Sequence, residues 1–503
     1  MKQPSEQIRK IVIAGGGTAG WMTAAALSSM LDTKHVDITL IESEEIGTVG
    51  VGEATIPDIK NFNQMLGIEE AEFLRATKGT FKLGIEFSDW GQLGDKYFHP
   101  FGVHGVDMNG IDFHQYWLRL QRAGNNEAIE HYSMCALAAK KMKFALPNND
   151  ARSPLSQIRY AYHFDASAYA AYLRSYAEKR GVKRIEGKFK QIIVHSESGN
   201  LDSLVLGDGS LVNADFFFDC TGFKSMLLGK ALGVQYNDWS HWLPCNSAQA
   251  VPTERTGELL PYTKSMAKSA GWQWRIPTQH RTGNGHIYST DFISDDEANE
   301  VLMSGLGAKP LADPRIIRFQ TGCRKEFWHK NCVAIGLSSG FLEPLESTSI
   351  FLIQQGISRF ISLYPTLNPS PKVAQEYNRL MTREFHQVRD FIILHYKATQ
   401  RSDSRFWRYC REMSIPDSLQ HKMDLFKTVG RVFRDDHELF TIPSWVAVMT
   451  GQNMQPLTVD PLLADVPIGG IQHSLQSMNT AMSRTVEQMP SHAEFIKRYA
   501  NAL

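Results

Sequence analysis

Three glycines near the start of the chain have the spacing of a phosphate-binding turn. Gly15, Gly17 and Gly20 form a Gly-x-Gly-x-x-Gly pattern. In such a pattern the first glycine permits a tight turn, the second lets the backbone approach a pyrophosphate, and the third lets a helix pack on a strand. Glu42 follows about 20 residues later, where a carboxylate can reach the ribose of a dinucleotide. The alternatives are a purely structural turn and a solvated glutamate at a strand end.

The segments around the glycines favour the dinucleotide interpretation. Residues 11–14 are a short apolar run that predicts a strand, and Ala24–Leu27 with Leu31 give the small, apolar face of a helix. A second strand is expected at Val36–Ile41, ending at Glu42. The start of the helix would offer free N–H groups and the positive end of its dipole to phosphates.

Composition limits the class of protein. The chain has 503 residues, 43% of them hydrophobic and 21% charged, which is typical of a globular protein of two to four domains. Its net charge is zero, so the composition implies no nucleic-acid partner. No apolar run is long enough for a membrane span, and the N-terminal sequence lacks the apolar core of a signal peptide, so we expect a cytoplasmic protein. The six cysteines form no CxxC pair, which favours buried, reduced thiols over a metal site.

The rest of the chain alternates between regular and irregular patterns. A glycine-rich loop is expected at 45–57, a helix at 57–66, and one strand with a polar face at 79–90. Residues 91–160 have the character of an irregular, aromatic-rich insertion with substrate-facing loops. Asp165 is expected to cap a helix that stops at Gly181. Turn signals then predict a β-meander from strands at 191–196, 201–206 and 211–219.

The last third of the sequence is expected to be mainly helical. Residues 225–330 suggest short strands and loops, 332–335 a buried strand, and 351–363 a helix. From Val373 onward the pattern is helical with few strand signals. We therefore predict an α/β fold of two domains. The order of glycine turn, acid at the second strand, meander and late strand–loop–helix resembles FAD-binding oxidoreductases of the hydroxylase type more than nicotinamide dehydrogenases. This resemblance implies that residues 1–370 form an FAD-binding Rossmann-like domain of the hydroxylase type with a β-meander, and residues 371–503 a mostly helical domain that completes the substrate site.

Four short motifs give the sequence a specific resemblance. Residues 50–55 read GVGEAT, 81–82 FK, 271–277 GWQWRIP and 343–348 EPLEST. Together, and in this order, they resemble the flavin-dependent halogenases, most closely the tryptophan halogenase family. The resemblance extends over about residues 8–400. It implies that reduced FAD and O₂ oxidise a halide to hypohalous acid, while the protein binds halide, guides the oxidant and places an aromatic ring.

The resemblance assigns two catalytic residues. Lys82 would hydrogen-bond hypohalous acid or capture the halogen as a haloamine, whereas a solvated lysine is the plain alternative, as expected for Lys78. Glu346 would stabilise the cationic ring and accept its proton. Its plain alternative is a glutamate favoured by the following helix dipole. Glu343 is the competing acid.

The resemblance also implies the ligand-binding residues. Thr348 and Ser349 would hold the halide; because relatives commonly have glycine at the second position, we expect bromide to be accepted at least as well as chloride. The expected cofactor-binding residues are Gly15, Gly17, Thr18, Ala19, Gly20, Glu42, Glu53, Leu337 and Ile350. No aspartate follows Gly336, which argues against a phenol hydroxylase. A second nucleotide motif is absent from the sequence, so a separate flavin reductase should supply FADH₂.

Aromatic residues complete the expected site. His99 and Phe101 match positions that sandwich an indole in the family, with Phe440 as a third ring; His99 could equally be an ordinary loop histidine. Trp272 and Trp274 either contact substrate or form a wall that keeps it from the flavin. The segment FTIPSWVAVMTG lacks the polar cluster that holds the amino-acid end of tryptophan. An indole or larger indole derivative is therefore favoured over free tryptophan.

Other functions remain open from the sequence. A halogenase of a carrier-bound or large aromatic substrate, a flavin monooxygenase, and a catalytically silent flavin- or ligand-binding protein are the alternatives. The presence of Lys82, Glu346 and the halide segment together argues against the silent protein. The chain is expected to act as a monomer or homodimer, without a metal, nucleic acid or membrane partner.

Overall fold

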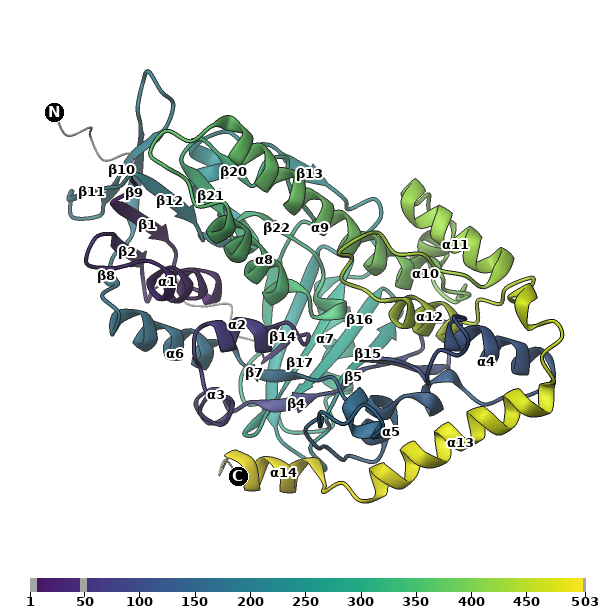
Figure 1. Ribbon diagram of the computed structural model, residues 1–503. Coiled ribbons are helices and arrows are strands. Elements are labelled where there is room, and N and C mark those ends of the chain that lie inside the picture. Colours follow the sequence, from purple (N-terminus) through teal and green to yellow (C-terminus); the bar gives the residue numbers. More distant parts are fainter. Residues whose placement is uncertain (1–6, 46–51, 501–503) are drawn as a thin grey trace.

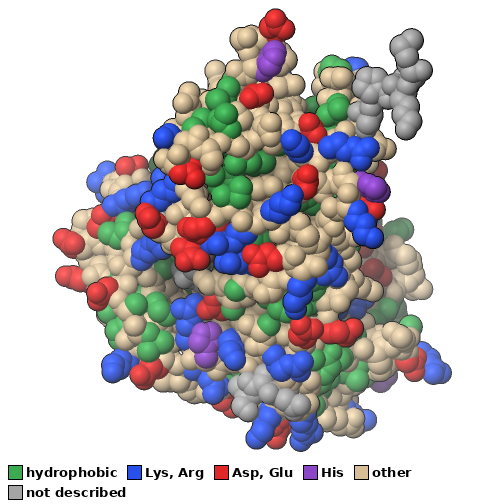
Figure 2. Space-filling model, turned by 90° about the vertical axis from the view of Figure 1, so that its left-hand side faces the viewer, with side chains coloured by type: hydrophobic (Ala, Val, Ile, Leu, Met, Phe, Trp, Pro, Cys, Tyr) green, Lys and Arg blue, Asp and Glu red, His purple; other side chains and the backbone are tan. Residues whose placement is uncertain are grey.

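A computed structural model describes residues 7–45 and 52–500. Gly50 and Val51 of the GVGEAT motif, together with the rest of 46–51 in the predicted loop at 45–57, lie outside the described residues. Among the described residues, no helix combines the length and apolar character that crossing a membrane requires. On the face in Figure 2, acidic and basic side chains are interspersed, in keeping with the zero net charge of the sequence.

The glycine turn belongs to a six-stranded sheet at the upper left of Figure 1. In spatial order its strands are β20 (Trp328–His329), β21 (Cys332–Ala334), β12 (Phe216–Asp219), β1 (Lys10–Ala14), β2 (Asp37–Glu42) and β8 (Lys183–Glu186). All neighbours are parallel except β20 and β21. Helices α1 (Thr18–Met30), α6 (Ala166–Glu178) and α8 (Ser349–Ser362) pack together beside this sheet. The predicted strand–turn–helix and second strand are confirmed.

A seven-stranded sheet occupies the centre of the molecule (Figure 1). In spatial order its strands are β18 (Arg315–Arg318), β14 (Ser247–Glu254), β17 (Arg281–Tyr288), β16 (Gly271–Pro277), β15 (Thr263–Lys268), β5 (Gly84–Ser88) and β6 (Lys96–Pro100). Only β5 and β15 run parallel. The expectation of short strands and loops is wrong for 247–288, because four antiparallel strands of six to eight residues fill that stretch.

Three small sheets complete the strands. They contain β3 (Gly52–Ala54), β7 (Ala161–Asp165) and β4 (Thr80–Lys82); β9 (Phe189–Val194), β10 (Leu201–Leu206) and β11 (Leu211–Asn213); and β13 (Tyr236–Asp238), β19 (Gly322–Arg324) and β22 (Gly340–Phe341). The second of these sheets is the predicted meander. Its last predicted strand, 211–219, is divided into β11, which stays in the meander, and β12, which joins the parallel sheet.

The predicted single strand at 79–90 is broken at Leu83. Residues 80–82 pair with β7, whereas β5 joins the central sheet. Leu83 lies between the two parts. Its N–H donates to the carbonyl of Pro261, and its carbonyl accepts from the N–H of Phe101. The break gives Lys82 a buried environment that simple alternation does not predict.

Helices cover the sheets and form most of the C-terminal third. Their bounds are α2 (Ile59–Met65), α3 (Glu70–Thr77), α4 (Phe113–Arg122), α5 (Met134–Lys140), α7 (Asp295–Ser304), α9 (Pro371–Lys397), α10 (Arg405–Glu412), α11 (Asp417–Val429), α12 (Ile442–Gly451), α13 (Ile468–Glu487) and α14 (His492–Ala500), with a π-helical turn at Met226–Ala231. The Asp165 cap is confirmed, because its carboxylate accepts from the N–H groups of Ser167 and Ala168. The expectation of an irregular insertion at 91–160 is wrong in part, since it contains β6, α4 and α5.

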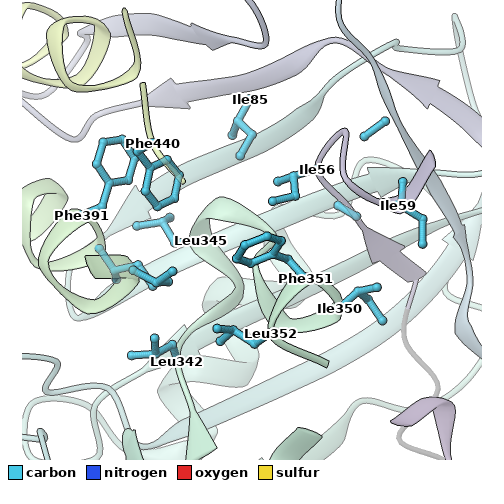
Figure 3. Packing of buried hydrophobic residues seen from close by; sticks show 14 of the residues in the cluster. Ile56, Ile59, Ile85, Leu342, Leu345, Ile350, Phe351, Leu352, Phe391 and Phe440 are labelled. Carbon is cyan, nitrogen blue, oxygen red and sulfur yellow. The ribbon is translucent and has the colours of Figure 1, made fainter. Parts of the chain in front are cut away.

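One apolar cluster joins the early and late parts of the chain. It contains Ile85 of the central sheet, Phe351 of α8 and Phe391 of α9 (Figure 3). Helix α9 spans both sheets: Asn378 donates to the carbonyl of Trp328 in β20, and His395 contacts Tyr97 in β6. All six cysteines are buried and unpaired, as predicted. The division into domains at residue 370 stays a prediction.

Candidate active site

The glycine turn is shaped by close backbone contacts. Gly15 has φ +110°, and a Cβ there would lie 2.2 Å from the carbonyl oxygen of Cys220. A Cβ on Gly20 would lie 1.9 Å from the carbonyl oxygen of Gly15, at the crossing of helix and turn. Helix α1 begins after Gly17 with no acidic residue in its first turn. Its first N–H groups are therefore suited to an anionic ligand.

Residues of this turn line a cavity of about 890 Å³. It is lined by Gly15, Gly17, Thr18, Ala19, Glu42, Glu53, Leu337 and Ile350, eight of the nine predicted cofactor residues. Gly20 lies outside the lining and serves packing. The lining also includes Trp272, Trp274, Ser347 and Ser349. A cavity lined by a glycine turn, by carboxylates and by two indole rings is suited to a dinucleotide that carries an aromatic ring system.

Two carboxylates on this cavity differ in their partners. Glu42 accepts from Arg184 Nε at 2.5 Å and from Trp21 Nε1 at 3.2 Å, with Arg174 at 3.7 Å. Its carboxylate is thus anchored at the end of β2, and Arg184 is a residue that sequence reasoning missed. Glu53 has no charged partner within residues 7–45 and 52–500, and burial raises its pKa to about 8.

Lys82 lies between the cavity and a group of aromatic side chains. Its side chain is fully buried, and its Nζ donates to Ser347 Oγ at 2.7 Å and to the carbonyl of Thr55 at 3.0 Å. The centre of the Phe101 ring is 5.1 Å from the same nitrogen. Burial lowers the pKa of Lys82 to about 7, while the negative charge of Glu346 opposes that shift. Ser347 also lines the cavity; from the sequence it was expected only as part of the possible anion-binding segment 347–349, not as a partner of Lys82.

Glu346 is a buried carboxylate held by two histidines. His99 Nδ1 lies 3.0 Å from each of its oxygens, and His395 Nε2 lies 2.8 Å from Oε1. Burial alone would raise the pKa of this carboxyl, but its interactions with His99 and His395 outweigh that effect and lower the pKa to about 2. Glu346 is therefore ionised at neutral pH.

Glu343, the competing acid, faces a different set of side chains. Its Oε2 accepts from Trp272 Nε1 at 2.9 Å and from the hydroxyl of Tyr396 at 2.5 Å. Burial raises its pKa to about 7. The structure brings Glu346, not Glu343, to Lys82 and His99.

The segment predicted to hold halide has an unsatisfied polar group. Ser347 is left-handed, with φ +61°, and Thr348 precedes the first turn of α8. Thr348 is fully buried, and its Oγ1 has no hydrogen-bond partner among the described residues. A hydroxyl without a partner at a helix start is suited to an anion. Ser349 lines the cavity, whereas Thr348 does not.

The predicted aromatic residues form two groups. Trp272 and Trp274 lie on the cavity with ring centres 6.1 Å apart. Phe440 stacks on Phe391 at 3.7 Å (Figure 3), and the His99 ring lies 6.5 Å from Phe440. The structure therefore places His99 and Phe440 near Glu346 and Phe101 near Lys82, apart from the tryptophan pair.

Sequence reasoning missed Phe391 and His395, which α9 contributes to the site. Both lie in the run FIILHY, where a single histidine interrupts an apolar helix surface. A polar side chain in a fully buried helical run requires a partner. That signal was present in the sequence, but the identity of the partner depends on contacts nearly fifty residues away.

The parallel sheet, the glycine turn and the cavity that extends to two indole rings define an α/β flavoprotein-type enzyme. Comparisons with known proteins give its family. The tryptophan halogenase family model matches residues 10–468. Tryptophan 6-halogenase SttH from Streptomyces toxytricini is 33% identical over 97% of both chains.

Solved structures agree with this family. Xcc4156, a flavin-dependent halogenase from Xanthomonas campestris, has a TM-score of 0.95 and 45% identity over 98% of each chain. BrvH, a flavin-dependent halogenase from Brevundimonas sp. BAL3, has the same score and identity over 98% of this chain and 99% of its own. This chain belongs to the tryptophan halogenase family and is a flavin-dependent halogenase. The predicted family and α/β fold class are confirmed.

Proposed function

We propose that this enzyme halogenates an electron-rich aromatic ring of the indole type, using FADH₂, O₂ and a halide ion. The observation that carries the proposal is the position of Lys82. Its buried amino group contacts Ser347 on the cavity side and lies beside Phe101 on the other side. A lysine in this position is suited to receive an oxidant formed in the cavity and present it to an aromatic substrate.

FAD is the cofactor that the cavity fits best. The glycine turn and the start of α1 would hold its pyrophosphate, Glu42 and Glu53 would contact its polar groups, and Leu337 and Ile350 would line its ring end. The bound reduced flavin, with O₂, supplies the oxidising power that converts halide into hypohalous acid. A diffusible reductase would supply the flavin, since the sequence has one nucleotide motif.

Halide would bind at the start of α8. The unpartnered Thr348 hydroxyl and the first N–H groups of the helix provide donors for an anion. Ser349 adds a second hydroxyl on the cavity side. We expect bromide to be used at least as well as chloride.

Lys82 can act in either of two ways. As an ammonium it would donate a hydrogen bond to hypohalous acid; as a neutral amine it would capture the halogen. With a pKa of about 7, both forms are populated at neutral pH. Glu346, which is ionised, can stabilise the cationic ring and accept its proton.

The substrate would stack among His99, Phe101 and Phe440. Flat aromatic walls favour an indole or a similar ring. SttH is a tryptophan 6-halogenase by name. In this chain, however, residues 445–449 of α12 are buried core, and none of these five side chains carries a charge, an amide or a hydroxyl that could hold an amino acid. A bare indole or a larger indole derivative therefore fits better than free tryptophan.

The proposal is tested by turnover. Purified enzyme, FAD, a flavin reductase and NADH are incubated with equal bromide and chloride and a panel of indoles, and products are identified by mass spectrometry. We expect brominated indole from the wild type and none from Lys82→Met, with flavin binding retained in both. Lys78→Met, which alters an exposed neighbouring lysine, is the matched control and should behave as the wild type. Normal turnover by Lys82→Met would overturn the role of Lys82, and strong preference for chloride would overturn the halide assignment.

A further inference from the structure

His395 lies in the last turn of α9 and is the second histidine on Glu346. Its ring is fully buried and stacks on Phe87 with ring centres 4.7 Å apart, while Trp90 meets it edge-on. This packing leaves only the two nitrogens for polar contacts. Nε2 lies 2.8 Å from Glu346 Oε1, and Nδ1 lies 3.0 Å from the hydroxyl of Tyr97.

The side chains behind His395 determine its tautomer. Gln452 Nε2 donates to the oxygen of Tyr97 at 3.3 Å and to the carbonyl of His395 at 3.0 Å. Because the oxygen of Tyr97 accepts from Gln452, its O–H is available to donate to Nδ1 of His395. The proton of a neutral imidazole then resides on Nε2, which faces Glu346. Burial also lowers the pKa of His395, which favours this neutral form.

We infer that His395, oriented by Tyr97 and Gln452, is a positioning residue that fixes the carboxylate of Glu346 and keeps it ionised. The inference rests on the proposed function in one respect: there, the Glu346 carboxylate stabilises the cationic ring and accepts its proton. Among the described residues, the charged or titratable groups that face Glu346 are Lys82, Tyr97, His99 and His395, and those that face His395 are Glu346, His99 and Tyr97.

His99 and His395 lie in different surroundings, which gives them different roles toward Glu346. His99 is on β6 beside Phe391 and Phe440, where the substrate ring is expected. His395 is enclosed by aromatic side chains; its Nδ1 is hydrogen-bonded to the hydroxyl of Tyr97, and its Nε2 lies 2.8 Å from Glu346 Oε1. A ring nitrogen fixed 2.8 Å from the carboxylate is therefore suited to holding the orientation of Glu346 independently of His99.

The test measures the ionisation of Glu346 directly. Infrared difference spectra of flavin-free protein are recorded against pH, and the Glu346 carboxyl band is identified by its loss in Glu346→Gln. His395→Phe keeps a ring in the aromatic enclosure but removes both nitrogens. We expect the midpoint of Glu346 protonation to rise by about two units in this variant. At pH 4 about half of Glu346 would be protonated, against almost none in the wild type.

Two further variants separate positioning from packing. His395→Gln restores an N–H donor that can reach Glu346 and should return the midpoint toward the wild-type value. Tyr97→Phe keeps the ring but removes the hydroxyl that orients His395, and should raise the midpoint by a smaller amount. His286→Phe, at a fully buried histidine outside this site, is the control for loss of an imidazole and should leave the band unchanged.

Turnover gives the second readout. In His395→Phe we expect kcat for indole bromination to fall about tenfold, and the acidic limb of its pH profile to move to higher pH with the infrared midpoint. Equal midpoints in wild type, His395→Phe and Tyr97→Phe would overturn the inference; if His395→Phe does not fold, Tyr97→Phe alone decides. Shifted midpoints with no indole turnover in any protein would support the positioning role and refute the proposed substrate instead.

Discussion

Two buried glutamates three residues apart have opposite ionisation behaviour. Glu343 and Glu346 lie at the two ends of one short turn, Glu343–Glu346, and both are almost completely buried. The pKa of Glu343 is raised to about 7 by burial, whereas that of Glu346 is lowered to about 2 despite burial. The turn directs one side chain toward Trp272 and Tyr396 and the other toward His99 and His395.

The difference shows that the partners of a buried acid decide its charge. Glu343 receives hydrogen bonds from two neutral donors, an indole and a phenol, which only partly offset desolvation. Glu346 has two imidazoles and the nearby Lys82 amino group. One side of the turn is thus suited to holding Trp272 against the flavin cavity, and the other to stabilising a cationic reaction intermediate.

The largest expected effect comes from removing the negative charge of Glu346. Glu346→Gln should lower kcat for indole bromination by about 10²- to 10⁴-fold, the usual contribution of a positioned acid or base. Flavin affinity, measured by fluorescence titration, should change little, because Glu346 does not line the flavin cavity. Glu343→Gln is the matched control: its amide oxygen can still accept from Trp272 and Tyr396, so activity should stay within a few-fold of the wild type. Comparable losses in both variants would abolish the distinction between the two acids.

The sequence was sufficient for features that depend on neighbouring residues. The glycine turn, the first two strands, the Asp165 cap and the meander follow from short patterns of apolar, turn and capping residues, and the structure contains all of them. The motifs were also sufficient for the family. Lys82, Glu346 and His99 were predicted as site residues from that resemblance, and the structure brings all three together.

Features that depend on distant contacts were not predictable. The break at Leu83 arises because 80–82 and 84–88 pair with strands that come much later in the chain, at 161–165 and 263–268. The alternating pattern left Lys82 indistinguishable from a solvated lysine. His395 and Phe391 belong to an ordinary helical pattern, and only the docking of α9 on the site gives them a role.

The next effect is on stability, and its sign differs between the two acids. The pKa of Glu346 is about 2 when folded and 4.5 when unfolded, so its stabilisation is complete above pH 4.5 and is lost as pH falls toward 2. The folded pKa of Glu343 is raised to about 7, so it destabilises the fold increasingly as pH rises from 4.5 to 7.

Urea unfolding of the two glutamine variants at pH 5 and pH 8 would measure this difference. At pH 8 Glu346→Gln should lower the free energy of unfolding, and Glu343→Gln should raise it, each on the order of 3 kcal/mol. At pH 5 the gain from Glu343→Gln should shrink to less than about 1 kcal/mol, whereas the loss from Glu346→Gln should persist. If Glu343→Gln changed the free energy of unfolding equally at pH 5 and pH 8, ionisation of Glu343 would not destabilise the folded protein.

The smallest expected effect concerns the tryptophan that Glu343 holds. Trp272→Phe removes the N–H donor to Glu343 and should lower the free energy of unfolding by about 1–2 kcal/mol, the value of one buried hydrogen bond to an acid. Trp274→Phe is the matched control, because its indole nitrogen is buried without a partner among the described residues and it lines the same cavity. It should destabilise less.

Measuring halogenation by these two variants shows whether the Glu343 side of the turn takes part in the chemistry. Since a phenyl ring still occupies each position and neither tryptophan contacts Lys82 or Glu346, kcat should remain within a few-fold of the wild type in both. The pKa of Glu343 should rise further in Trp272→Phe alone, because that hydrogen bond lowers it in the wild type. A large loss of kcat in Trp272→Phe, with kcat preserved in Trp274→Phe, would show that Glu343 and Trp272 act on the chemistry and not only on the shape of the cavity.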